Sequence, residues 1–507
     1  MPAPAASSPA APSDEVAALR HQVGELAAEV EHLKLLVAKY RRVHFGRRAE
    51  PWPAEGQLDL PLGLQLPPLP PKAPAPDTSP CPTRRPSRKR RPFPDSLPRE
   101  TIHHLPAHTC CPCCGGAFKP LGEEVAEILE YVPASYKVIR HVRPKLACAR
   151  CDHISQADAP VRPIPRGIAG PALLAHVLVG KFCDHLPLYR QSAIYTRSGL
   201  TLERSLLADW VAQCHTLLTP LVDALGRHVM AADKIHADDT PLPVLSPGKG
   251  QTKTARLWAY VRDDRPAAST DPPAVWFAYS ENRKGLHPCA HLSRFKGILQ
   301  ADAYSGFDAL FTNGEIVEAA CWAHVRRKFY DLHRAQASPL AAEALTRIQA
   351  LYAIEAQARG ELPAVRRALR QPARALLEEL HQWLKAQSLR VSRKSGLMEA
   401  IGYALNHWPA LIRYSTDGRI EIDNNAAERA LRAVAIGRKN FLFAGSDAGG
   451  ERAAAMYSLI GTATLNSLDP EAYLREVLGR IAEHPINRIE ELLPWHLLPA
   501  QELPKAA

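Results

Sequence analysis

The sequence predicts a multidomain α/β protein with a mixed β-sheet at its centre. Three observations carry this prediction: a heptad repeat near the N-terminus, two pairs of cysteines after it, and five segments of alternating hydrophobicity farther along. A chain of 507 residues with 46% hydrophobic residues has enough apolar side chains to bury several cores. We therefore expect about three or four structural units.

The net charge and the lack of targeting signals indicate which partners and which location to expect. A formal net charge of +11 favours an acidic polymer or surface as partner, the alternative being a solvated basic face. The N-terminus lacks a basic segment followed by an apolar one, and the longest apolar run, residues 170–180, is too short to span a bilayer. We expect a cytoplasmic protein with no membrane partner. Its clustered cysteines then point to metal binding rather than to disulfides.

A heptad repeat follows residues 1–13, which we expect to be disordered. Apolar residues recur at alternating steps of three and four, with valine at the a positions and leucine at nearly every d position; they are Val16, Leu19, Val23, Leu26, Val30, Leu33, Val37 and Tyr40. This choice of residues favours a parallel two-stranded coiled coil over residues 14–45. It predicts a homodimer or a higher oligomer. The alternative is a single amphipathic helix packed on its own domain.

A proline-rich basic linker is expected over residues 46–100, because so many prolines prevent a helix or a central strand. Within it lies the sequence RRPSRKRR, whose basic residues are Arg84, Arg85, Arg88, Lys89, Arg90 and Arg91. Such a run is often only a solvated segment. Beside an enzyme that acts on nucleic acid, it would serve as an unspecific phosphate-binding arm.

Two cysteine pairs predict a zinc-binding module over residues 101–160. Their spacing is that of a four-thiolate tetrahedral site with ligands Cys111, Cys114, Cys148 and Cys151. We expect the Zn²⁺ to be structural, since no open coordination position is implied. Cys110 and Cys113 have the same spacing, so the register stays open, and His153 is a possible substitute ligand.

Residues 161–230 have a helical pattern that resembles a helix-turn-helix. A turn at Ser198-Gly199 separates two helices, and Thr201 would be the N-cap of the second, with Arg204 and Ser205 exposed near its start. The second helix would then be able to enter a major groove. Plain packing in a helical bundle is the alternative.

In the region after residue 230, apolar and polar residues alternate with a period of two. Five short strands are expected in the segments KIHADDTPLPVL, ARLWAYVRD, AVWFAYSEN, GILQADAYSGF and EIVEAACWAHVRRKF. Three long strands, a crossover and two further strands suggest a ribonuclease-H-like catalytic domain. Its first part would be residues 231–329 and its second part residues 413–466. An all-helical insertion would occupy residues 330–412, which are rich in Ala, Leu, Arg and Glu.

In this layout two acids lie on neighbouring strands. Asp238 is on the first strand and Asp302 is at the C-terminal end of the fourth, whereas Asp239 points to the opposite face from Asp238. Converging carboxylates suit Mg²⁺, and two such ions would hold the attacking and leaving oxygens of a phosphodiester. Each aspartate taken alone is also explained as a turn or cap residue.

Glu428 has two interpretations. With Asn425 at N-cap it would be the N3 residue of a capping box, or it would be the third metal-binding acid. Arg429 and Arg432 share one side of the same helix, and Arg438 and Lys439 follow in a loop suited to phosphates.

The remaining candidates have simpler explanations. In the fifth strand, His324 is expected to pack under a basic loop that carries Arg326 and Arg327, the alternative being a base or a ligand. The isolated Cys183, Cys214, Cys289 and Cys321 are expected in the core. The C-terminal helical tail, residues 467–507, ends in an apolar segment expected to dock on the catalytic domain.

Together these motifs resemble a transposase of the insertion-sequence-66 family, an Asp-Asp-Glu transposase. The likeness is carried by HFGRRAE, CPCCGG with CARC, HLPLYRQSAIYTRSG with LADW, HADDTPLPVL, ADAYSGF, CWAHVRRKF, NNAAERALRAVAIGRKNFLF and HPINRIEELLPWHL, and it extends from the heptads to the C-terminus. Two positions depart from the family pattern: Asp239 stands where glutamate is usual, and Ala303 where glycine is common.

The resemblance implies that Asp238, Asp302 and Glu428 are the catalytic triad and bind Mg²⁺ or Mn²⁺. It also implies DNA partners, transposon ends and target, and possible small accessory proteins, with a nucleoid-associated location. The candidate DNA contacts are basic: the linker residues above together with Arg204, Arg326, Arg327, Arg429, Arg432, Arg438 and Lys439. Two rival functions are a nuclease without strand transfer and a catalytically inert DNA-binding regulator.

Overall fold

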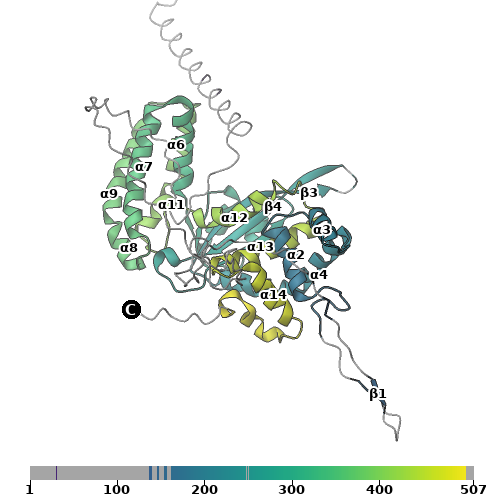
Figure 1. Cartoon of the computed structure of the whole chain (residues 1–507). Helices are drawn as coiled ribbons and strands as arrows, with labels where there is room; N and C mark the ends of the chain where they lie inside the picture. The colour runs from purple at the N-terminus through teal and green to yellow at the C-terminus, as the bar shows by residue number, and fades with distance from the viewer. Residues whose placement is uncertain are drawn as a thin grey trace, which may run out of the picture. The chain divides into compact units, whose positions relative to one another are not determined.

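The computed structural model describes residues 161–246, 248 and 250–497, together with residues 30, 33, 136, 138–139, 145–147 and 154–156. The chain divides into two compact units (Figure 1): Ala49–Ala157 is one, and Met1–Arg48 with Asp158–Ala507 is the other. Each unit is described by itself.

The smaller unit contains a short hairpin. Strands β1 (Lys145–Ala147) and β2 (Ile154–Gln156) pair antiparallel, with Leu146 opposite Ser155. The predicted zinc ligands and the basic linker run lie outside the described residues. Of the predicted heptad positions, only Val30 and Leu33 are described, and both are helical and exposed. The coiled coil therefore stays a prediction.

The larger unit is built around a five-stranded mixed sheet with the order β5-β4-β3-β6-β7. Its strands are β3 (Lys234–Ser246), β4 (Gln251–Arg262), β5 (Ala274–Ser280), β6 (Gly297–Gln300) and β7 (Ile316–Ala319). Strands β3, β4 and β5 pair antiparallel, while β6 and β7 run parallel to β3. All five strands expected from the period-two pattern are present. The last ends at Ala319, so placing His324 in a strand was wrong.

Residues 257–261 of β4 are buried on both faces, as expected of a sheet covered by helices on each side. Trp258 packs against Phe307 of the 3-10 helix η2 (Ser305–Phe311), with ring centroids 6.0 Å apart. On the same face, the Tyr260 hydroxyl is 3.0 Å from Nδ1 of His291 in α5 (Leu286–His291). The other face of β3 and β4 is covered by α12 (Asn425–Gly437).

The outer edge of β5 is capped by side chains of α13 (Asp447–Leu465). Ser458 Oγ accepts the N–H of Phe277 at 2.8 Å, and Thr462 Oγ1 accepts the N–H of Val275 at 3.1 Å. These bonds satisfy backbone donors that an open sheet edge would leave unpaired.

Helices packed with the sheet share one hydrophobic core with it. Besides α12 and α13 they are α2 (Pro171–Phe182), α3 (Leu188–Arg197), α4 (Arg204–Met230) and α14 (Pro470–Arg480). The 3-10 helices η1 (Arg265–Ala267), η4 (Ile486–Leu492) and η5 (Pro494–His496) complete this part. The apolar C-terminal segment docks as expected, since Leu492 and Leu493 are buried in this core.

Two expectations for this part need correction. Thr201 is not the N-cap of the second helix, because α4 begins at Arg204 after Glu203. Leu202 is buried and its carbonyl accepts the Ser192 hydroxyl at 2.6 Å, which ties the connection down before the helix starts. Cys183 is exposed rather than in the core, because it follows the last residue of α2.

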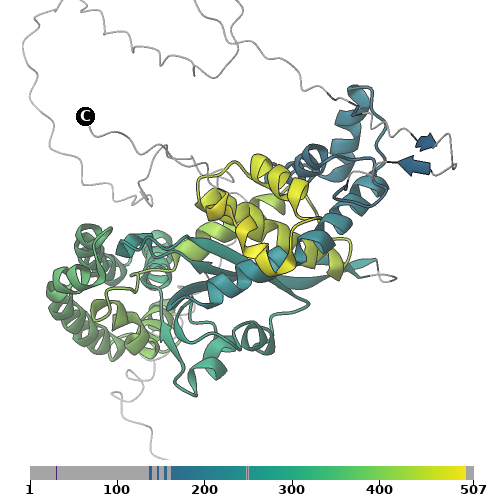
Figure 2. The same cartoon turned by 90° about the horizontal axis from the view of Figure 1, so that it is seen from below.

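A second hydrophobic core lies in a helical region between β7 and α12, visible in green to one side of the sheet in Figures 1 and 2. Its helices are α6 (Trp322–Gln336), α7 (Pro339–Ala358), α8 (Pro363–Leu369), α9 (Gln371–Ser388), α10 (Gly396–Asn406) and α11 (Trp408–Ile412), followed by η3 (Arg413–Ser415). None of the helices in the described part of the chain combines the length and the apolar character needed to cross a membrane.

Candidate active site

Asp238 lies on β3, directly opposite Ala259 of β4. Its Oδ1 accepts the backbone N–H of Asp239 at 2.7 Å. Burial and the neighbouring charge of Asp302 raise the pKa of Asp238 to about 8, with a smaller contribution in the same direction from Glu428. The protein alone therefore stabilises the ionised form of this carboxyl group poorly.

Asp302 follows β6, and the sheet register explains why it approaches Asp238. Strands β3 and β6 run parallel, and His236 is paired with Gln300. If the same register continues for two more residues, Asp238 and Asp302 lie side by side. Asp302 Oδ1 accepts the N–H of Tyr304 at 3.2 Å, and the Tyr403 hydroxyl donates to the Asp302 carbonyl at 2.8 Å. The parallel pairing thus unites two acids that are distant in sequence.

Glu428 lies in the first turn of α12, on the helix that covers β3 and β4. The capping box is not formed, because the N-cap is Asn424 and no side-chain cap bond is made there. Glu428 Oε1 is buried and has no hydrogen-bond partner, while Oε2 is 3.5 Å from the Arg327 guanidinium. A capping role therefore does not explain this glutamate.

The three acids are not gathered into one ligand set. They are close enough for Asp302 and Glu428 to raise the pKa of Asp238. Among the described residues, however, the one group of three or more ligand atoms within 4.8 Å of one another is Cys321, His324 and Glu428. Two ions about 4 Å apart would be able to bridge a wider carboxylate spacing than a single ion.

Asp239 points to the opposite face from Asp238, as expected from the strand period. It is opposite Trp258, and its carboxylate binds Arg256 at 3.0 Å and Arg283 at 2.8 Å. Arg283 also lies 3.9 Å from Asp302. Asp239 is therefore a neutralised acid that helps to hold a guanidinium beside the second aspartate.

Asn424 is a positioning residue that the sequence reasoning missed. It is fully buried, its amide donates to the Ala237 carbonyl at 2.8 Å, and its Oδ1 lies 3.0 Å from Nδ1 of His236. The start of α12 is thereby tied to β3 beside Asp238. The sequence signal was the Asn-Asn doublet ahead of Glu428, of which the second residue was interpreted as the cap.

A second connection joins β6 to the segment before α12. Gln300 donates to the Glu421 carbonyl at 2.6 Å and accepts the Glu421 N–H at 3.2 Å. Glu421 in turn pairs with Arg366 of α8 at 2.8 Å. The helical region therefore contacts the segment that leads to Glu428.

The candidate DNA contacts differ in exposure. Arg204, Arg429, Arg432 and Lys439 are exposed, Arg327 is half-exposed, and Arg438 is partly buried with its guanidinium donating to the Pro241 carbonyl at 2.6 Å. Arg326 must be corrected: it is 9% exposed because α6 packs it into the helical region, where it lies over the Tyr330 ring. It does not offer a surface for phosphates.

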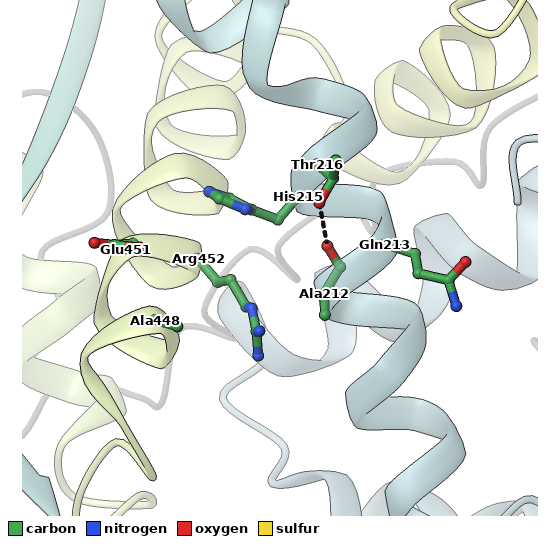
Figure 3. Close-up of a pocket in the computed structure, with 7 residues that line it drawn as sticks. All are labelled: Ala212, Gln213, His215, Thr216, Ala448, Glu451 and Arg452. Atoms are coloured by element: carbon green, nitrogen blue, oxygen red, sulfur yellow. Dashed lines mark hydrogen bonds between the residues drawn. The ribbon is translucent and has the colours of Figure 1, made fainter.

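A surface depression lies away from these acids, between α4 and α13 (Figure 3). It is lined by Ala212, Gln213, His215, Thr216, Ala448, Glu451 and Arg452. The side chains are those of two packed helices, and burial followed by the charge of Arg452 lowers the pKa of His215. None of the three acids contributes to it.

The donor set fits a hard divalent cation. Asp238, Asp302 and Glu428 supply carboxylate oxygens, the ligands that Mg²⁺ and Mn²⁺ prefer. Burial and the charges of Asp302 and Glu428 raise the pKa of Asp238, and Glu428 Oε1 is buried without a hydrogen-bond partner. A pair of cations would relieve both, and these three residues would hold the pair between them.

Comparison with known proteins adds the family. Residues 166–452 match the model described as "Transposase IS66 family", which covers more than half of the chain. The chain belongs to this family. Three further models match: "zinc-finger binding domain of transposase IS66" at residues 108–152, "IS66 C-terminal element" at 458–495, and "Transposase C of IS166 homeodomain" at 32–102.

Relatives of this IS66 transposase are found in Sinorhizobium fredii. The uncharacterized protein y4hP is 43% identical over 421 residues, which cover 80% of this chain and 76% of the relative. The uncharacterized protein y4qI is 42% identical over 396 residues, covering 76% and 74%. The family domains support a transposase role, and they imply a divalent metal in the main domain and zinc in the zinc-finger domain.

Proposed function

We propose that this IS66 transposase cleaves phosphodiesters at transposon ends and joins the resulting 3′-OH ends to target DNA, with Asp238, Asp302 and Glu428 as its catalytic acids. The observation that carries the proposal is the approach of three acids from β3, the end of β6 and α12: together with burial, the charges of Asp302 and Glu428 raise the pKa of Asp238 to about 8. Acids that destabilise one another are typical of a site built for cations.

The sheet order supports a ribonuclease-H-like catalytic domain. Three antiparallel strands followed by two parallel ones, in the order β5-β4-β3-β6-β7, place Asp238 on the central strand and Asp302 beyond its parallel neighbour. The helical region between β7 and α12 would be an insertion in this domain, because its helices form a second hydrophobic core, to which the sheet adds Ile298 of β6 and Ala319 of β7.

Each side chain has a defined part in the proposed reaction. Bound Mg²⁺ or Mn²⁺ would activate the attacking water or 3′-OH and stabilise the leaving oxygen. Asp238 and Asp302 would hold the ions from the sheet, and Glu428 from the covering helix. Asn424 fixes the start of that helix against Ala237, and Arg327, 3.5 Å from Glu428, is placed to attract a phosphate.

Recognition of the transposon ends is assigned to other parts of the chain, since three acids read no bases. We assign it to the zinc module with Cys111, Cys114, Cys148 and Cys151, and to helices α3 and α4 with Arg204 exposed at the start of α4. The coiled coil would pair two protomers and so bring two DNA ends together.

The test is a strand-transfer assay with the full-length protein, DNA carrying the ends of its own element, and a target plasmid in Mg²⁺ or Mn²⁺. We expect cleavage and joining by the wild type, and losses of at least about 100-fold in Asp238→Asn, Asp302→Asn and Glu428→Gln, because each removes a metal ligand. Glu399→Gln, which removes an exposed acid paired with Lys328, is the control and should retain activity.

The outcomes separate the rival functions. Cleavage without joining would favour a nuclease, and DNA binding without cleavage would favour a regulator. Full joining by Glu428→Gln would remove Glu428 from the catalytic set while leaving the aspartates in place.

A further inference from the structure

Three potential metal ligands of different chemistry meet beside the proposed catalytic acids. One ligand atom each from Cys321, His324 and Glu428 lie within 4.8 Å of one another. Cys321 and His324 come from the start of α6, and Glu428 from the first turn of α12. Two helix starts that are far apart in sequence are thus brought together around a thiol, an imidazole and a carboxylate.

The local fold explains why the two α6 residues point to the same place. Cys321 is the N-cap of α6, and His324 is the third residue of the helix, so the Cys-x-x-His spacing turns both side chains to the same side of the helix start. The Cys321 sulfur is fully buried and accepts the backbone N–H of Asn424 at 3.1 Å. Burial raises the pKa of the Cys321 thiol and this amide donor opposes the rise, so the metal ion itself would displace the proton.

The side chains of this cluster do not form hydrogen bonds with one another. His324 Nδ1 and Glu428 Oε1 are both buried without a hydrogen-bond partner. The His324 Nε2 to Glu428 Oε1 distance of 3.8 Å is too long for a hydrogen bond. Buried polar atoms without partners are rare and costly in folded proteins, and a bound ion is one of the standard explanations.

We propose that Cys321, His324 and Glu428 form a binding site for a borderline-soft divalent metal ion such as Zn²⁺. Sulfur and imidazole nitrogen are ligands that Zn²⁺ accepts and Mg²⁺ avoids, so this set selects a different ion from the carboxylates alone. Three protein ligands leave one coordination position open for water. Binding releases the thiol proton of Cys321 to solvent, since the thiolate is the ligand.

The site shares Glu428 with the proposed catalytic set, which gives it a consequence for activity. Zn²⁺ bound through Glu428 Oε1 would withdraw this carboxylate from the hard-cation site. The ion would also compete with Arg327, which lies 3.5 Å from Oε2. Zn²⁺ would therefore inhibit the Mg²⁺-dependent reaction. This consequence rests on the proposed function, whereas the binding itself does not.

The direct test counts metal ions on the full-length protein. The wild type, Cys321→Ala and His324→Gln are stripped with a chelator, reloaded with Zn²⁺ and measured by inductively coupled plasma mass spectrometry. The predicted zinc module contributes equally to all three proteins, so the expected result is one ion fewer per chain in each variant. Titration with Co²⁺ should show a thiolate-to-metal absorption in the wild type that is weaker in Cys321→Ala.

The matched control is Cys214→Ala, which removes another buried cysteine, in α4; within the described part of the chain it belongs to no group of potential ligands. It should bind as many ions as the wild type. Equal metal counts in all four proteins would overturn the proposal. His324→Gln changes a partly exposed side chain, so it decides the question if Cys321→Ala does not fold, as judged by circular dichroism.

An activity measurement separates the two proposals. Zn²⁺ is titrated into the Mg²⁺-dependent cleavage assay, and each protein is compared with its own zinc-free rate. Loss of a ligand in His324→Gln should raise the inhibitory Zn²⁺ concentration at least about 10-fold. If no protein cleaves DNA but the metal counts still differ, the proposed function fails and the Zn²⁺ site stands. If cleavage occurs with equal counts, the reverse holds.

Discussion

Two clusters of buried charge in the larger unit have opposite designs. In the helical region, Glu355 accepts Arg370 at 2.6 Å and Arg366 at 2.9 Å, so acids and bases neutralise each other. At the sheet, burial and the like charges of Asp302 and Glu428 raise the pKa of Asp238 to about 8. We call the first cluster complete because its charges balance within the protein, although Arg366 Nε and Nη1 have no hydrogen-bond partner. The second cluster is incomplete because its charges do not balance.

The difference indicates what each cluster is for. A buried charge without a partner costs stability unless something else neutralises it. The Glu355 cluster is placed to hold the fold: Arg370 also donates to the carbonyls of Tyr414 and Ile420, in the segment that leads to α12. The acids on the sheet destabilise the metal-free protein and so point to a cationic ligand.

The largest expected effect comes from breaking the complete cluster. Arg370→Met should lower the free energy of unfolding by about 3–5 kcal/mol, because it leaves Glu355 as a buried and only partly compensated charge and three carbonyls without a donor. Urea unfolding followed by circular dichroism would measure it. DNA cleavage should fall as well, because the lost contacts hold the segment before Glu428.

An exposed ion pair provides the control for this variant. Arg480 and Glu476 pair on the surface of α14 at 3.4 Å, so Arg480→Met should change the free energy of unfolding by less than about 0.5 kcal/mol. A change of similar size in both variants would mean that the Glu355 cluster contributes no more than an ordinary surface pair.

In the incomplete cluster, removing a charge should stabilise the metal-free protein instead of destabilising it. The pKa of Asp238 is raised from 3.8 to about 8, so between these pH values the folded state holds a proton that the unfolded state has lost. The free energy of unfolding of metal-free wild type should therefore fall as pH rises through this window. Asp238→Asn should remove that part of the fall and be the more stable protein at pH 8.

Added Mg²⁺ sharpens this comparison. At about 100 times its dissociation constant, Mg²⁺ should stabilise the wild type by roughly 2.7 kcal/mol and Asp238→Asn by much less. Differential scanning calorimetry at pH 5 and pH 8, with and without Mg²⁺, measures both effects. If metal-free Asp238→Asn is less stable than the wild type at pH 8, the repulsion attributed to these acids is absent.

The contrast also shows what sequence patterns are able to predict. The five strands and the approach of Asp238 to Asp302 follow from period-two segments and from the way parallel strands align, both of which are local or topological. In the sequence Arg366 and Arg370 look like surface residues of a solvated helix. They are buried because they pair with Glu355 on another helix, and because Arg370 also donates to backbone carbonyls. Their role depends on tertiary contacts that no local pattern contains.

The errors at the helix starts have a related cause. Asn425 and Thr201 are both good N-cap residues, and propensity placed the caps there. In the structure, Asn424 binds β3 and Leu202 enters the core, so tertiary contacts moved each start. His324 was assigned to a strand because the apolar run around it has no clear period at the junction of β7 and α6.

The smallest expected effect concerns the backbone beside Asp302. Ala303 has φ = 62°, in the left-handed region that favours glycine. Ala303→Gly should raise the free energy of unfolding by about 0.5–1 kcal/mol, because the strain of the Cβ outweighs the entropy that glycine loses. Ala337→Gly is a matched variant in the helical region, with φ = 49° at the end of α6. Thermal unfolding should show a similar gain in stability for both variants. A gain at Ala337 alone would mean that the left-handed backbone at Ala303 carries no strain that glycine can relieve.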